Sequence, residues 1–119
     1  PLRLSWGECR PGHLFNYKGK LCGIDAESCA FAESERDYGE FLWWMFDLRT
    51  HDLEEHDIKL AKVFLKNFDS PIEKWRILGW AWLVNFFFLL WDIRRGRKDR
   101  QLRLLTFASG LEKLAENII

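Results

Sequence analysis

The sequence predicts a single α+β domain, with a small N-terminal antiparallel β-sheet of two to four short strands in residues 1–33 and a helical bundle in residues 34–119. The bundle is expected to hold about four α-helices packed around a central hydrophobic helix. Three observations predict this layout: apolar residues alternate with period two near the N-terminus, they recur at three- and four-residue spacing from Ser34 onward, and residues 77–91 are almost entirely apolar. A chain of 119 residues is long enough to bury one core.

The opening segment has the alternation of a half-buried strand. Successive side chains of a strand point to opposite faces, so every second residue shares a face. The expected buried face holds Leu2, Leu4 and Trp6, and the expected solvent face holds Arg3 and Ser5.

Turn residues divide the rest of this region into short strands. Residues 13–24 are expected to form a hairpin that turns near Lys18 and Gly19, because glycine readily adopts the positive φ of a tight turn. A further short strand is expected in residues 29–32.

Two helices are expected next, each with an acidic residue placed to complete its N-terminal cap. The first is expected to run from Ser34, its N-cap, to about Thr50, and the second to begin at a capping box formed by Asp52 and Glu55. The expected buried stripe of the first helix is Phe41, Trp44, Met45 and Leu48, and that of the second is Leu53, Leu60, Ala61, Phe64 and Phe68.

The sequence DSPIEKW marks the start of a third helix. Ser70 is expected as the N-cap, Pro71 as the first helical residue and Glu73 as the partner that completes a capping box. After an interruption near Gly96, a fourth helix is expected, with a buried side formed by Leu104 or Leu105, Ala108, Leu111, Leu114, Ala115 and Ile118.

The apolar run of residues 77–91 is interpreted as a core helix covered on all sides. A membrane span needs about 20 apolar residues, and charged residues flank this shorter run at both ends. The basic flank resembles that of a membrane helix, so a membrane-associated protein anchored by this helix is kept as an alternative. Within the run, Asn85 is expected to find a hydrogen-bond partner, at the wet edge of the core or at a subunit contact.

Charges are segregated along a chain whose formal net charge is zero. Residues 25–57 contain eleven acidic and two basic residues, whereas residues 58–103 contain eleven basic and four acidic residues. The two segments can neutralise each other within one monomer, between subunits or through a charged partner.

Six cations form a cluster within ten residues: Arg94, Arg95, Arg97, Lys98, Arg100 and Arg103. Arginine side chains suit phosphate oxygens, so nucleic-acid binding through this basic cluster is an alternative. A domain built for nucleic acid usually has a basic balance that this chain lacks. The favoured interpretation is that the cluster pairs internally or with an acidic protein partner.

The metal-like residues are Cys9, His13, Cys22 and Cys29, at a spacing that lacks the two close ligand pairs of a zinc finger. No cofactor is therefore predicted, and zinc is kept as an alternative. The sequence HDLEEH places His51 with Glu55 and Asp52 with His56 at i and i+4, which is interpreted as ordinary helix pairing, since it departs from the HExxH pattern of metalloproteases.

The predicted function is non-enzymatic. The sequence shows no Gly-rich phosphate loop after a strand and no nucleophile elbow, whereas its seven Trp and ten Phe residues are typical of interfaces. We expect a small interaction or regulatory protein that binds a protein partner or itself, for example as a homodimer. The expected contacts are the exposed members of the pair Trp43 and Trp44, together with the basic cluster. Three cysteines without an apparent secretory leader favour a reducing, intracellular location, cytoplasmic or nuclear.

Overall fold

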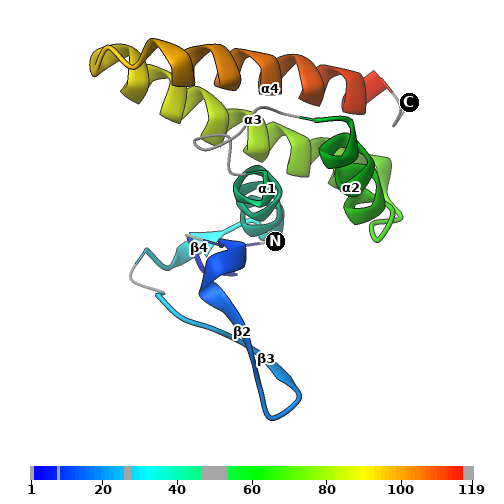
Figure 1. Cartoon of the computed structure of the whole chain (residues 1–119). Coiled ribbons are helices and arrows are strands. Elements are labelled where there is room, and N and C mark those ends of the chain that lie inside the picture. Colours follow the sequence, from blue (N-terminus) through cyan, green and yellow to red (C-terminus); the bar gives the residue numbers. More distant parts are fainter. Residues whose placement is uncertain (1, 8, 26–27, 47–53, 117–119) are drawn as a thin grey trace.

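The computed structural model describes residues 2–7, 9–25, 28–46 and 54–116 (Figure 1). In these residues the elements follow in the order β1 (Arg3–Ser5), the short 3-10 helix η1 (Pro11–His13), β2 (Leu14–Tyr17), β3 (Lys20–Gly23), β4 (Ala30–Ala32), α1 (Ser34–Met45), α2 (Glu55–Leu65), α3 (Pro71–Arg94) and α4 (Lys98–Glu116). Strands at the N-terminus followed by four helices confirm the predicted α+β layout.

The strands form two separate antiparallel pairs, β1 with β4 and β2 with β3. The β2–β3 hairpin turns at Lys18 and Gly19, which have φ values of 52° and 77°, and the Gly19 N–H donates a 2.9 Å hydrogen bond to Asn16 Oδ1. Positive φ at both central residues suits the right-handed twist of a hairpin, which confirms the predicted turn. The hairpin projects away from the helices (Figure 1).

The predicted orientation of β1 is wrong. Ser5 is buried and donates a 2.8 Å hydrogen bond to Asp37 Oδ1 on α1, and the backbone N–H groups of Trp6 and Gly7 donate to the same carboxylate. Leu2 and Leu4 are exposed instead. Three hydrogen bonds to one carboxylate hold the polar side of the N-terminal segment against α1. The leucines of the strand therefore face outward.

The predicted stripe of α1 is also shifted. The buried residues are Leu42, Trp43 and the C-cap residue Phe46, whereas Phe41 and Trp44 are half-buried. Because every residue from 41 to 46 is apolar, helical spacing alone allows more than one stripe. The predicted Leu48 and Thr50 lie outside the described residues.

The helix N-termini follow their local signals to different degrees. Ser70 Oγ accepts a 3.4 Å hydrogen bond from the Glu73 N–H, and Pro71 is the first residue of α3, as predicted. At α1 the N-cap is Glu33 rather than Ser34, without a side-chain cap bond. The capping box of α2 uses Glu54 and Asp57 rather than the predicted Asp52 and Glu55, and Asp52 lies outside the described residues.

One core joins the four helices, and α3 and α4 run side by side above α1 (Figure 1). Its buried apolar residues are Leu42, Trp43, Phe46, Ala61, Leu65, Ile77, Leu78, Ala81, Leu104, Phe107, Leu111 and Leu114. Of the expected stripes, Leu60 and Leu105 are exposed, and Leu53 and Ile118 lie outside the described residues. The core is built on one half of α3, so the expectation that this helix is covered on all sides is wrong.

Candidate interaction surface

The Trp43 and Trp44 side chains have different environments. Trp43 is 1% exposed, so it is a core residue and offers no surface to a partner, which corrects the expectation for this residue. Trp44 is half-buried, and the Arg10 guanidinium lies 4.1 Å from the centroid of its ring. Of the pair, Trp44 is the residue that a partner could reach.

Asn85 is the polar centre of the α1–α3–α4 contact. Its Oδ1 accepts a 3.0 Å hydrogen bond from Trp43 Nε1, and its Nδ2 donates a 2.9 Å bond to the Leu104 carbonyl. The expectation of a hydrogen-bond partner is confirmed, but Asn85 lies inside the core rather than at its wet edge. A buried amide with a partner at each end holds three helices in one arrangement.

The half of α3 that is turned away from this core is exposed. Nine large apolar side chains between 41% and 67% exposed form what we call the outer face of α3: Ile72, Trp75, Trp82, Leu83, Phe86, Phe87, Leu90, Trp91 and Ile93. Buried residues such as Ile77, Leu78 and Ala81 occupy the opposite half. Since the helix is apolar all round, its sequence could not show which half the fold would cover.

Among the described helices, α3 has the length and composition that would allow a membrane span. In its most apolar eighteen-residue window, 28% is buried. Most of this window is therefore exposed in the fold, so α3 is at once part of the core and part of the surface.

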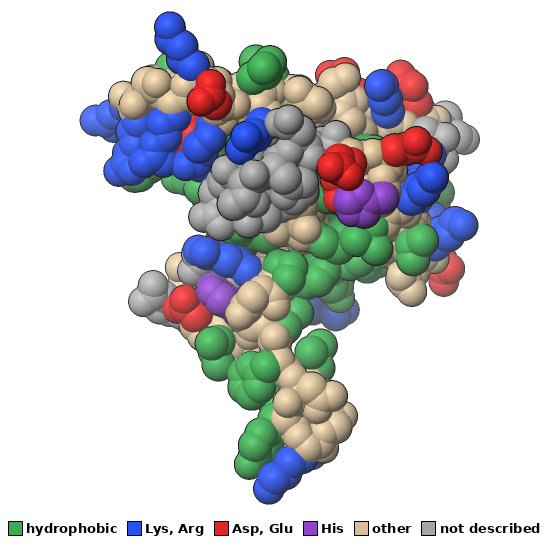
Figure 2. Space-filling model, in the orientation of Figure 1, with side chains coloured by type: hydrophobic (Ala, Val, Ile, Leu, Met, Phe, Trp, Pro, Cys, Tyr) green, Lys and Arg blue, Asp and Glu red, His purple; other side chains and the backbone are tan. Residues whose placement is uncertain are grey.

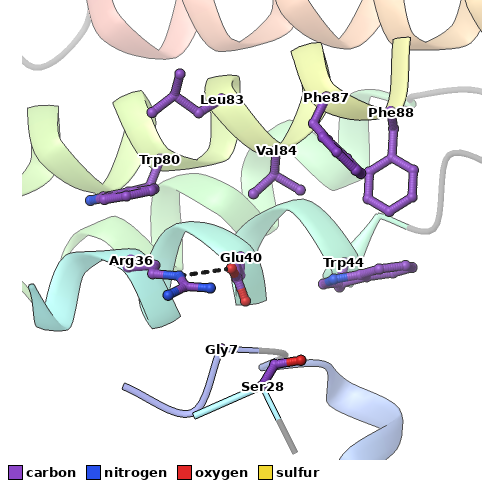
Figure 3. A pocket seen from close by; sticks show the side chains of 10 residues that line it. All are labelled: Gly7, Ser28, Arg36, Glu40, Trp44, Trp80, Leu83, Val84, Phe87 and Phe88. Atoms are coloured by element: carbon purple, nitrogen blue, oxygen red, sulfur yellow. Dashed lines mark hydrogen bonds and ion pairs between the residues drawn. The ribbon is translucent and has the colours of Figure 1, made fainter. Parts of the chain in front are cut away.

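A groove lies between α1, α3 and the N-terminal loops (Figure 3). It has a volume of about 640 Å³ and is lined by Gly7, Ser28, Arg36, Glu40, Trp44, Trp80, Leu83, Val84, Phe87 and Phe88. Leu83 and Phe87 belong to the outer face as well, so the groove continues that face toward α1.

The groove contains one ion pair. Arg36 Nε donates a 3.2 Å hydrogen bond to Glu40 Oε1, as the dashed line in Figure 3 shows. Burial raises the pKa of Glu40, and the Arg36 guanidinium opposes this shift. Close by, burial and then the charges of Asp37 and Glu40 raise the pKa of the Cys9 thiol to about 11. Cys9 is therefore a protonated, weakly nucleophilic thiol at neutral pH.

The basic cluster lies at the corner between α3 and α4, where Lys and Arg side chains gather in Figure 2. Two of its members pair internally: Arg100 Nε is 3.0 Å from Asp92 Oδ2, and Arg97 Nη1 is 3.8 Å from Asp92 Oδ1. Asp92 is fully buried, so these arginines neutralise a carboxylate of α3 itself rather than the acidic segment of residues 25–57. Arg94, Arg95 and Lys98 are exposed and Arg103 is half-buried.

An ion pair between α1 and α3 joins the acidic and basic segments of the chain. Arg76 Nη1 of α3 lies 3.3 Å from Glu35 Oε1 of α1. Because the Arg76 side chain is about half exposed, this pair contributes at most about 1 kcal/mol to stability. Within α2, the exposed pair of Lys59 Nζ with Glu55 Oε1, 3.0 Å apart, also joins the two charged segments.

The structure does not gather the predicted metal candidates into a site. Among the described residues, no group of three or more His, Cys, Asp or Glu is placed to hold a metal ion. His13 Nε2 instead lies 3.7 Å from Asp25 Oδ2, and Cys22 Sγ contacts the Lys20 carbonyl at 3.7 Å. Cys9 and Cys22 are half-buried thiols, and Cys29 is exposed.

The HDLEEH motif lies partly outside the described residues, which exclude His51 and Asp52. His56 lies within them, 3.3 Å from Glu54 and 3.2 Å from Asp57 at the first turn of α2. These contacts place His56 beside Glu54 and Asp57, the two residues that form the capping box of α2.

Comparison of the chain with family models, with curated proteins and with solved structures finds no match. An apolar helix face, a groove that continues it and a nearby group of exposed cations are suited to binding an apolar or amphipathic surface.

Proposed function

We propose that this chain is a small, non-enzymatic interaction protein that binds through the outer face of α3. The observation that carries the proposal is the division of α3 into a buried half, which completes the core, and an exposed half that is equally apolar. An exposed apolar face of this extent typically marks a binding surface in a soluble protein.

Burial of this face against a partner supplies the free energy of binding. Each square ångström of apolar surface removed from water contributes about 25 cal/mol, and a fully buried Leu or Phe side chain about 1.5–3 kcal/mol. The outer face holds five aromatic side chains, Trp75, Trp82, Phe86, Phe87 and Trp91, and such rings dominate the energetics of interfaces.

Trp44 and the basic cluster are proposed to extend the contact at its margins. Trp44 lines the groove beside Phe87 and Phe88, so a partner that covers the outer face can also reach its ring. Nucleic-acid binding has less support, because Arg97 and Arg100 already neutralise Asp92.

Photo-cross-linking tests whether the outer face is the contact surface in the cell. A photoreactive phenylalanine analogue at position 86 of the full chain should yield cross-linked products, of protein or of lipid, on irradiation. Phe31 of β4 is the matched control, since it is a more exposed phenylalanine that lies far from α3 in sequence. Equal yields at the two positions, or none at either, would contradict the proposal.

A further inference from the structure

We propose that the outer face of α3 docks onto an anionic lipid surface, with the helix lying along the surface instead of crossing it. This inference rests on the proposed function, because it assigns a partner to the same face. It follows from the burial of α3, from its neighbours in the fold and from the charges at its ends.

The fold permits α3 to lie on a membrane but not to span one. Its inner half packs against α1 and α4, and α4 runs beside it with exposed charges that include Lys98, Asp99, Glu112 and Lys113. A spanning α3 would carry these charges into the hydrocarbon, where each has a large free-energy cost. Only the outer half of α3 is free to enter the boundary between headgroups and acyl chains.

The arrangement of side chains around the outer face matches that boundary. By helical spacing, Leu83, Phe86 and Leu90 lie near the middle line of the face, with Trp75 and Trp82 toward one margin and Trp91 toward the other. Tryptophan has an apolar ring with a polar N–H, and it gathers where acyl chains meet headgroups. With the helix along the surface, the middle line of the face would enter the lipid most deeply, and the tryptophans on its margins would lie nearer the headgroups.

The charges of α3 favour an anionic surface. Arg76 lies near its start and the exposed Arg94 and Arg95 at its end, where the Arg95 guanidinium is 4.2 Å from the centroid of the Trp91 ring. Between Arg76 and Arg94 the only acidic residue is Asp92, which is fully buried. Arg94 and Arg95 therefore present cations to anionic headgroups at the end of α3. Near the start of the helix, Arg76 is shared with Glu35 of α1, and the exposed carboxylate of Glu112 on α4 lies beside Trp75 and Trp82.

The same charges disfavour a second copy of this chain as the occupant. In a two-fold antiparallel pairing of α3 with itself that is centred on residue 85, Arg76 of one chain would face Arg94 of the other. Like charges at both ends of the contact would repel each other, whereas an anionic bilayer attracts both.

Vesicle partitioning tests the proposal. The full chain is mixed with phosphatidylcholine vesicles, with and without about a quarter phosphatidylserine, and bound protein is measured by co-sedimentation. We expect binding to the anionic vesicles, with a blue shift of tryptophan fluorescence. The variant L83Q/F86Q/L90Q should lower the partition coefficient about a hundredfold, because it removes three inserting side chains.

Matched variants separate insertion from attraction by charge. L2Q/L4Q/F31Q removes the same residue types from another exposed site and should leave partitioning unchanged. R94Q/R95Q should weaken binding to anionic vesicles about tenfold and leave binding to neutral vesicles unchanged. Its control is K62Q/K66Q, which replaces two exposed lysines of α2 and its C-cap and should weaken binding to anionic vesicles less.

The outcomes distinguish this inference from the proposed function. Absent binding to anionic vesicles, or binding that L83Q/F86Q/L90Q leaves unchanged, overturns the lipid proposal. If light scattering then shows a dimer that the same variant dissociates, the occupant is a second copy and the proposed function stands. If neither partitioning, self-association nor cross-linking depends on the outer face, both proposals fail.

Discussion

At the scale of single residues, the structure depends on polar groups that are satisfied inside an aromatic core. Asn85 is 3% exposed, and its side-chain amide bonds to Trp43 at one end and to the Leu104 carbonyl at the other. A buried polar group without its partner has a free-energy cost of about 1–3 kcal/mol. The contribution of Asn85 therefore depends on both bonds being made.

Removing the indole donor should reveal that dependence. Trp43→Phe keeps a ring in the core but leaves Asn85 Oδ1 without its donor, so the free energy of unfolding should fall by about 2–4 kcal/mol, from the lost bond and the smaller ring. Urea denaturation measures the loss. Trp75→Phe on the outer face is the control. A similar loss of unfolding free energy in that variant would show that the Trp43–Asn85 hydrogen bond does not contribute measurably to stability.

The Cys9 thiol makes the docking of the N-terminal segment measurable. Because its pKa is raised from 9.0 to about 11, little thiolate is present at neutral pH, and iodoacetamide should modify Cys9 at least about tenfold more slowly than the exposed Cys29. The rate at Cys9 should rise with pH through a midpoint near 11. Modification rates are measured by mass spectrometry, and equal rates at Cys9 and Cys29 near pH 7 would contradict the burial of the Cys9 thiol.

At the scale of elements, two glycines with opposite surroundings control how closely the helices approach. A Cβ at Gly39 of α1 would overlap the Trp80 Cβ and the Ile77 carbonyl oxygen of α3, whereas a Cβ at Gly79 would meet nothing within 4 Å. The close approach of α1 and α3 thus requires glycine at position 39 but not at position 79.

Alanine substitution at these two glycines should change stability in opposite directions. Gly39→Ala should lower the free energy of unfolding by about 1–3 kcal/mol, because α1 and α3 must move apart. Gly79→Ala should raise it by up to about 1 kcal/mol, because alanine favours the helix and fills open space. Thermal denaturation of both variants is the measurement, and a stabilising Gly39→Ala would mean that the helices do not meet there.

Some elements could be predicted from the sequence because their signals are local. Ser70 with Pro71 and Lys18 with Gly19 act on backbone within a few residues of themselves, so the sequence predicts this helix start and this hairpin turn correctly. The face of β1 could not be placed, because Asp37 binds that segment from a distant part of the chain.

The candidate site was predicted less well than the elements. The basic cluster was visible as a run of cations, but its division into paired and exposed members depends on Asp92, which sequence reasoning did not single out. The outer face and the groove were missed because α3 is apolar all round. The signal that could have suggested them is the aromatic content, which exceeds what a small core needs.

At the scale of the whole molecule, α3 connects stability with binding. Its inner half holds α1 and α4 together through Ile77, Leu78, Ala81 and Asn85, and its outer half remains exposed. A partner can therefore cover the outer half without any change in the fold. The hydrophobic side chains visible along the β2–β3 hairpin in Figure 2 lie on a separate projection and are not part of this face.

The free energy of unfolding of the L83Q/F86Q/L90Q variant, measured by urea denaturation without lipid, tests this division of α3 most directly. Because the three side chains are exposed, we expect a value within about 1 kcal/mol of the unsubstituted chain. Ile77→Ala, on the buried half, should instead lose about 2–5 kcal/mol. A loss in the triple variant as large as that of Ile77→Ala would show that the outer half is packed in the folded chain and is not a binding surface.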